Sequence, residues 1–111
     1  MKVSTSVEEE GIALLEVEGE VNAYTARDLD RALNELLAQG HSRVLLDASK
    51  VVFITSAGLR AITFAQREAQ QQGGEVRLFG LSDLVRRVFE MAGLDEVLHL
   101  SDTRQEAMVD W

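Results

Sequence analysis

The pattern of apolar residues changes abruptly between positions 51 and 60, and this change constrains the fold more than any other feature. Residues 51–54 read Val-Val-Phe-Ile, a β-branched and aromatic run typical of a strand. Two hydroxyl residues, Thr55 and Ser56, follow, then two small residues, and apolar residues next recur at helical spacing. The stretch therefore predicts a strand that passes directly into a helix, with an exposed Ser56 at the start of that helix.

The remainder of the chain alternates between strand-like and helix-like patterns. Strands are expected at residues 2–8, 12–17, 43–47, 75–81 and 97–100, and helices at 25–39, 56–72, 82–93 and from 101 onward. The first two strands, joined by a polar turn, predict an antiparallel hairpin. The later alternation predicts right-handed βα units. The expected fold class is α/β: one domain with a mixed β-sheet, an N-terminal antiparallel hairpin and then alternating helices and strands.

Hydroxyl residues stand where each predicted helix begins. Thr25 and Asp28 have the spacing of a capping box. In a capping box, the side chain of each of the two residues accepts a hydrogen bond from the backbone N–H of the other. Ser82 and Ser101 are expected to cap the third helix and a short terminal helix.

Composition narrows the classes of function. The chain has 111 residues, 46% of them hydrophobic, which predicts one domain over residues 1–111. A net charge of −8 argues against binding to nucleic acid or to anionic membranes. The chain has no cysteine, which excludes thiol catalysis. Neither a signal peptide nor an apolar run of ~18 residues is found, so a cytoplasmic location is expected.

Three roles of Ser56 fit its position. It can serve only as an N-cap, it can be a nucleophile, or it can be an exposed site of phosphorylation. A nucleophilic serine needs a base, and the two histidines, His41 and His99, do not lie in runs that look like catalytic loops. We therefore expect no enzymatic activity, no metal site and no cofactor, and favour a protein-binding switch at Ser56.

Several motifs, in this order, resemble the STAS domain proteins of the anti-sigma factor antagonist type. The motifs are Val-Glu-Gly-Glu-Val-Asn at 17–22, Asp47, Val-Phe-Ile-Thr-Ser-Ala-Gly-Leu at 52–59, Gly-Gly-Glu at 73–75 and Val-Phe-Glu-Met-Ala-Gly-Leu at 88–94. The similarity extends over nearly the whole chain, and it implies a STAS-like fold.

The resemblance also implies a regulatory cycle. In that cycle the unphosphorylated antagonist binds an anti-sigma factor and so releases a sigma factor. The anti-sigma factor is itself a serine kinase that binds ATP and phosphorylates the antagonist, and a phosphatase reverses the step. Carried onto this sequence, Ser56 is the phosphorylated residue. The residues implied in partner binding are Asn22, Thr55, Ser56, Ala57, Gly58 and Leu59.

The sequence departs from the family pattern at three of these positions. Thr55 and Asn22 stand where many members have aspartate, and Ala57 stands where many have a second hydroxyl residue. Two alternatives therefore stay open. One is a non-phosphorylated STAS adaptor of a transporter or signalling complex, and the other is a sensor of a small ligand or nucleotide.

Overall fold

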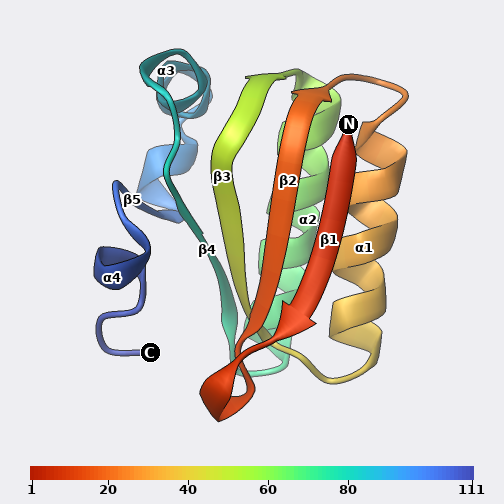
Figure 1. The fold of residues 1–111 in the computed structure, drawn as a ribbon, viewed down its shortest axis with the longest axis vertical. Helices are drawn as coiled ribbons and strands as arrows, with labels where there is room; N and C mark the ends of the chain where they lie inside the picture. Colours follow the sequence, from red (N-terminus) through yellow and green to blue (C-terminus); the bar gives the residue numbers. More distant parts are fainter.

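A five-stranded mixed sheet forms the centre of the molecule (Figure 1). The computed structural model describes residues 1–111, apart from the side chain of Glu9. The strands are β1 (Lys2–Val7), β2 (Ala13–Val21), β3 (Arg43–Ile54), β4 (Glu75–Phe79) and β5 (His99–Ser101). They lie side by side in chain order, with β1 antiparallel to β2 and all other pairs parallel. This arrangement confirms the predicted α/β class and the N-terminal hairpin.

A helix connects each parallel strand to the next, and a short last helix follows β5. The helices are α1 (Ala26–Ala38), α2 (Ser56–Gln71), α3 (Asp83–Met91) and α4 (Arg104–Ala107), with short 3-10 turns at η1 (Glu9–Gly11) and η2 (Leu94–Glu96). In Figure 1, α1 and α2 lie behind β1 to β3. Among the described residues, no helix combines the length and the apolar character needed to cross a bilayer.

The main core lies between the sheet and α1, α2 and α3. Side chains alternate along β2, so that Leu15 and Val17 face this core while Leu14 faces the other side of the sheet. Leu33 of α1 and Ile62 of α2 pack against the same core and are almost fully buried. The apolar stripes predicted for these helices are thus the faces that cover the sheet.

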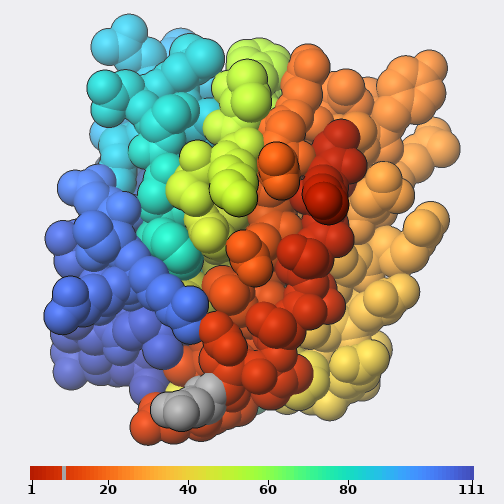
Figure 2. Space-filling model, viewed as in Figure 1, coloured from red at the N-terminus to blue at the C-terminus, as the bar shows by residue number. Residues whose placement is uncertain are grey.

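A smaller core lies on the opposite face, beneath the C-terminal segment. Leu14, Leu45 and Ala107 form part of it, with Trp111 packed alongside. Figure 2 shows this face of the molecule. The C-terminal residues, in blue, cover its left part, and the N-terminal strands β1 and β2, in red and orange, lie to their right. The buried guanidinium of Arg77 donates to the carbonyl oxygens of Ala107 (2.9 Å) and Val109 (2.7 Å), which fixes this segment.

Strand β3 differs from its prediction. Residues 43–47 were expected as a strand, with a second apolar run at 51–54, but one twelve-residue strand includes both. Its pairing with β2 shifts register between Glu16 and Glu18 and again between Gly19 and Glu20. Because such irregularities interrupt the alternation of side chains, Val52 and Phe53 are both exposed. Strand β2 likewise extends past the predicted end at residue 17, to Val21.

Two of the predicted helix caps are wrong. Thr25 makes no capping hydrogen bond from its side chain, and the Asn22 side chain and carbonyl bond the first N–H groups of that turn instead. Thr103, rather than Ser101, caps α4 by accepting from the N–H of Glu106 (3.2 Å). The Ser82 cap of α3 is confirmed, with its hydroxyl accepting from the N–H of Val85 (3.2 Å).

Candidate functional site

Two chain segments meet where β2 and β3 end. The N–H of Thr55 donates to the carbonyl oxygen of Val21 (2.9 Å), which continues the pairing of the two strands to their last residues. Asn22 follows Val21 directly, and Ser56 follows Thr55. The structure therefore brings all six predicted site residues to the carboxyl edge of the sheet, where functional loops of parallel sheets gather.

Asn22 organises the turn between β2 and α1. Its Oδ1 accepts from the N–H groups of Tyr24 (2.9 Å) and Thr25 (3.0 Å). The Thr25 hydroxyl accepts from the N–H of Asn22 (2.7 Å) and donates to the carbonyl oxygen of Glu20 (2.8 Å). These bonds satisfy the backbone of the turn locally and hold it in one conformation.

Ser56 is exposed and is the first residue of α2. The cap position belongs to Thr55, which is extended (φ −97°, ψ 175°), so Ser56 does not act as the N-cap. Thr55 makes no side-chain cap bond either. The first N–H groups of a helix have no partner within it, and the helix dipole adds partial positive charge there. The Ser56 hydroxyl therefore lies at the positive end of α2, open to solvent.

The hydroxyl of Thr55 has a different environment from that of Ser56. Its Oγ1 is buried and, among the described residues, has no hydrogen-bond partner. A buried hydroxyl without a partner costs about 1–3 kcal/mol of stability. Of the two adjacent hydroxyl groups, that of Thr55 is buried and that of Ser56 is exposed to solvent.

Gly58 and Leu59 are both buried, and Leu59 belongs to the main core. A Cβ added at Gly58 would lie 2.7 Å from side-chain atoms of Val21 and Ile54, far inside normal contact distance. Only glycine allows the first turn of α2 to rest this closely on the end of the sheet. Gly58 and Leu59 thus support the first turn of α2 from below, and partner contact at Asn22, Thr55, Ser56, Ala57, Gly58 and Leu59 stays a prediction.

Three exposed apolar side chains belong to the segments that lead to this edge, and the sequence did not predict their exposure. Tyr24 (81% exposed), Val52 (68%) and Phe53 (39%) belong to the two segments that meet at this edge. Phe53 and Val52 were assigned to a strand, and strand periodicity alone would have buried one of them. The bulged pairing with β2 exposes both, and that irregularity leaves no clear signal in the sequence.

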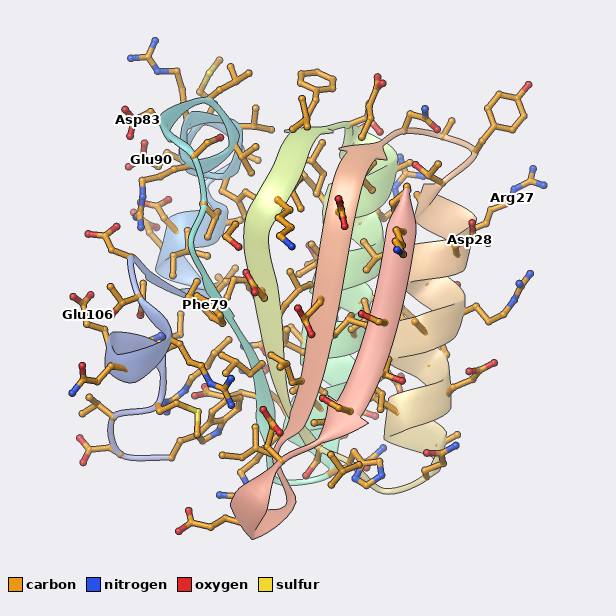
Figure 3. All side chains as sticks on the ribbon, in the orientation of Figure 1. Arg27, Asp28, Phe79, Asp83, Glu90 and Glu106 are labelled. Carbon is orange, nitrogen blue, oxygen red and sulfur yellow. The ribbon has the colours of Figure 1, made fainter. Side chains whose placement is uncertain are left out.

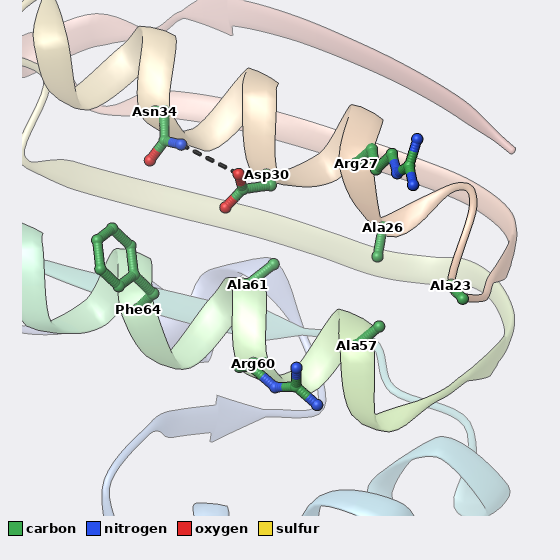
Figure 4. A pocket seen from close by; sticks show the side chains of 9 residues that line it. All are labelled: Ala23, Ala26, Arg27, Asp30, Asn34, Ala57, Arg60, Ala61 and Phe64. Atoms are coloured by element: carbon green, nitrogen blue, oxygen red, sulfur yellow. Dashed lines mark hydrogen bonds between the residues drawn. The ribbon is translucent and has the colours of Figure 1, made fainter.

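A groove runs between α1 and α2, beginning at the same edge. It has a volume of about 510 Å³ and is lined by Ala23, Ala26, Arg27, Asp30, Asn34, Ala57, Arg60, Ala61 and Phe64 (Figure 4). Ala26 from α1 and Ala61 from α2 point into the space between the helices. Arg27 and Arg60 are exposed on opposite walls, and Figure 3 shows Arg27 extending away from the sheet.

A family model for the STAS domain matches residues 4–107. The chain belongs to the STAS domain family. The anti-sigma-B factor antagonist of Listeria monocytogenes is 32% identical over 81% of this chain and 79% of its own. The anti-sigma-F factor antagonist RsfB of Mycobacterium tuberculosis is 29% identical over 94% of this chain and 84% of its own.

Solved structures agree with this assignment. The crystal structure of an anti-sigma factor antagonist from Mycobacterium paratuberculosis superposes with a TM-score of 0.84 and 26% identity. It covers 96% of this chain and 92% of that protein. The STAS fold predicted from the motifs is thereby confirmed.

Neither histidine of this STAS domain is placed to activate Ser56. His41 precedes the first residue of β3, whereas Ser56 follows the last, and β3 is twelve residues long. His99 pairs with Arg77, which pairs with Leu45 near the start of β3. Most of the length of β3 therefore separates both imidazoles from the serine hydroxyl. The arrangement at Ser56 thus offers an accessible hydroxyl without a general base from histidine.

Proposed function

We propose that the protein is a cytoplasmic anti-sigma factor antagonist in which residues 1–111 act as one STAS domain. It binds an anti-sigma factor that is also a serine kinase, and phosphorylation of Ser56 abolishes that binding. The kinase supplies the ATP site, and a phosphatase restores the unmodified form. The observation that supports this function best is the exposed Ser56 hydroxyl at the start of α2, adjoined by exposed apolar side chains.

The surface around Ser56 favours contact with another protein. Tyr24, Val52 and Phe53 expose apolar area, and exposed aromatic side chains are enriched in binding surfaces. Relatives named as anti-sigma factor antagonists match most of the chain, which points to an anti-sigma factor as the partner.

A phosphate at Ser56 is expected to act on binding and not on folding. It would add nearly two negative charges at a helix N-terminus, where N–H donors and the dipole stabilise an anion. Within a closely packed interface the same group must be desolvated and accommodated sterically. A loss of ~3 kcal/mol in binding corresponds to more than about a hundredfold in affinity.

The test measures binding of the purified anti-sigma factor by calorimetry. We expect Ser56→Ala to bind like the unmodified chain and Ser56→Asp to bind roughly a hundredfold more weakly. Ser4→Asp is the control, because Ser4 is an exposed serine on the edge strand β1, where it pairs with Glu16, outside the segments that end at Ser56 and Asn22. Equal affinities for Ser56→Ala and Ser56→Asp would contradict the switch.

Phosphorylation itself is tested by mass spectrometry after incubation with the anti-sigma factor and ATP. One added phosphate located at Ser56 is expected, and none in Ser56→Ala. A phosphate found at another residue instead would contradict the assignment of Ser56 as the phosphorylated residue.

A further inference from the structure

Building on the proposed function, we propose that the groove between α1 and α2 binds an acidic segment of the anti-sigma factor through Arg27 and Arg60. A phosphate on Ser56 then weakens this binding by drawing Arg60 into an ion pair within α2.

Charge is the first argument for the groove. The chain has 19 acidic and 11 basic residues, so an acidic partner segment is repelled by most of its surface. Arg27 lines the groove from α1 and Arg60 lines it from α2, and among the described residues neither forms an ion pair. The one carboxylate lining the groove, Asp30, accepts a hydrogen bond from Asn34 (3.2 Å). The groove therefore offers two cations that a carboxylate on another protein can reach.

The shape of the groove is the second argument. Its floor includes three alanines, Ala26, Ala57 and Ala61, so the backbone of a bound segment can approach closely. Ala23 lies near the end that adjoins Ser56, and Phe64 lies toward the other end (Figure 4). An apolar floor with one arginine on each side fits a segment with small or apolar side chains beneath and carboxylates that reach Arg27 and Arg60.

The third argument concerns the spacing of Ser56 and Arg60. They are four residues apart on α2, so they occupy one face of the helix with Cβ atoms about 6 Å apart. An acidic group placed four residues before a basic one is the more favourable order in a helix. Long helical side chains also point toward the N-terminus. Figure 4 shows this for Arg60, whose guanidinium extends toward Ala57 and hence toward the first turn.

The unmodified serine leaves Arg60 available to the groove, whereas a phosphate at the same position competes for it. Phosphorylation then has two effects on the partner. It places an anion at the edge of the docking surface, and it removes one of the two cations that the acidic segment binds.

Binding measurements test the role of the groove. We expect Arg27→Gln and Arg60→Gln each to weaken binding of the unphosphorylated protein to the anti-sigma factor by about tenfold. At high salt the difference between each variant and the wild type should largely disappear, because ions screen the arginine charges. Arg67→Gln is the matched control, since Arg67 is exposed on α2 outside the groove and is not expected to change the affinity. Equal affinities for all three variants and the wild type would overturn docking in the groove.

The ion pair is tested without any partner. Phosphoserine is incorporated at position 56 during translation, and ³¹P NMR follows the second ionisation of the phosphate. We expect the pKa to lie about half a unit lower with Arg60 than in the Arg60→Gln variant, because the cation favours the dianion. Arg67→Gln should leave it unchanged. The same pKa with and without Arg60 would overturn the ion pair.

The two experiments separate this inference from the proposed function. A wild-type chain that binds no anti-sigma factor would overturn the function and the docking together, whereas the NMR titration decides the ion pair in either case. If the wild type binds the anti-sigma factor and Ser56→Asp does not, but Arg27→Gln and Arg60→Gln bind normally, docking in the groove is overturned and the Ser56 switch is retained.

Discussion

Gly58 approaches Val21 so closely that a Cβ at position 58 would lie 2.7 Å from the Val21 Cγ1 atom. The first turn of α2 therefore rests directly on the last residues of the sheet. This contact fixes the position of the Ser56 hydroxyl relative to the neighbouring turn at Asn22.

Gly58→Ala tests this contact. Overpacking typically costs 1–3 kcal/mol, and the better helix propensity of alanine returns up to about 1 kcal/mol. We expect a net loss of about 1–2 kcal/mol in the free energy of unfolding, measured by urea denaturation. Val21→Ala relieves part of the clash, so the double variant should lose less than the sum of the two single changes. Strict additivity would show that the two residues do not collide.

Gln66 joins α2 to two other parts of the fold. Its Oε1 accepts from the N–H of Val76 (2.6 Å) and its Nε2 donates to the carbonyl oxygen of Val97 (3.2 Å), while the residue is 6% exposed. Gln66→Leu leaves both backbone groups without a partner. We expect a loss of about 2–4 kcal/mol in thermal or urea unfolding. The exposed Gln70→Leu is the control, and an equal effect there would contradict this role.

Arg77 holds the C-terminal segment against the sheet. Besides its two bonds to carbonyl oxygens, its guanidinium lies 4.5 Å from the centre of the Trp111 ring. Lysine keeps the charge but lacks the planar fork, so Arg77→Lys should release the segment. Trp111 is the only tryptophan, and its fluorescence is expected to shift to longer wavelength. An unchanged spectrum would mean that the ring stays packed without Arg77.

Thr55→Val removes the buried hydroxyl that lacks a partner in the described structure while keeping the shape of the side chain. Removing an unsatisfied polar group should raise the free energy of unfolding by about 1 kcal/mol. A loss of stability of similar size would reveal a partner for the hydroxyl in solution.

The element order and the position of Ser56 could be predicted because they depend on local patterns. One such pattern is the change from an apolar run to helical spacing at residue 56. Another is the glycine that follows each of α1 and α2 and marks the helix end. Each of these signals extends over only a few residues. The resemblance in the motifs added the STAS fold, which the comparisons confirm.

Features that depend on contacts between distant residues could not be predicted. The bulged pairing of β2 with β3 exposes Val52 and Phe53, and the Asn22 cap replaces Thr25 because the strand ends only at Val21. The burial of Gly58 follows from packing on Val21, thirty-seven positions earlier. Arg27 and Arg60 line one groove only because α1 and α2 lie side by side on the sheet.

The Oγ of Ser56 and the buried Oγ1 of Thr55 belong to consecutive residues, and Gly58 two positions further on packs tightly against Val21 and Ile54. A group attached at Ser56 can thus be added and removed while the backbone keeps its place. Under the proposed function, the response would be as fast as the kinase and the phosphatase, because no slow refolding step would separate the chemical change from its effect on association.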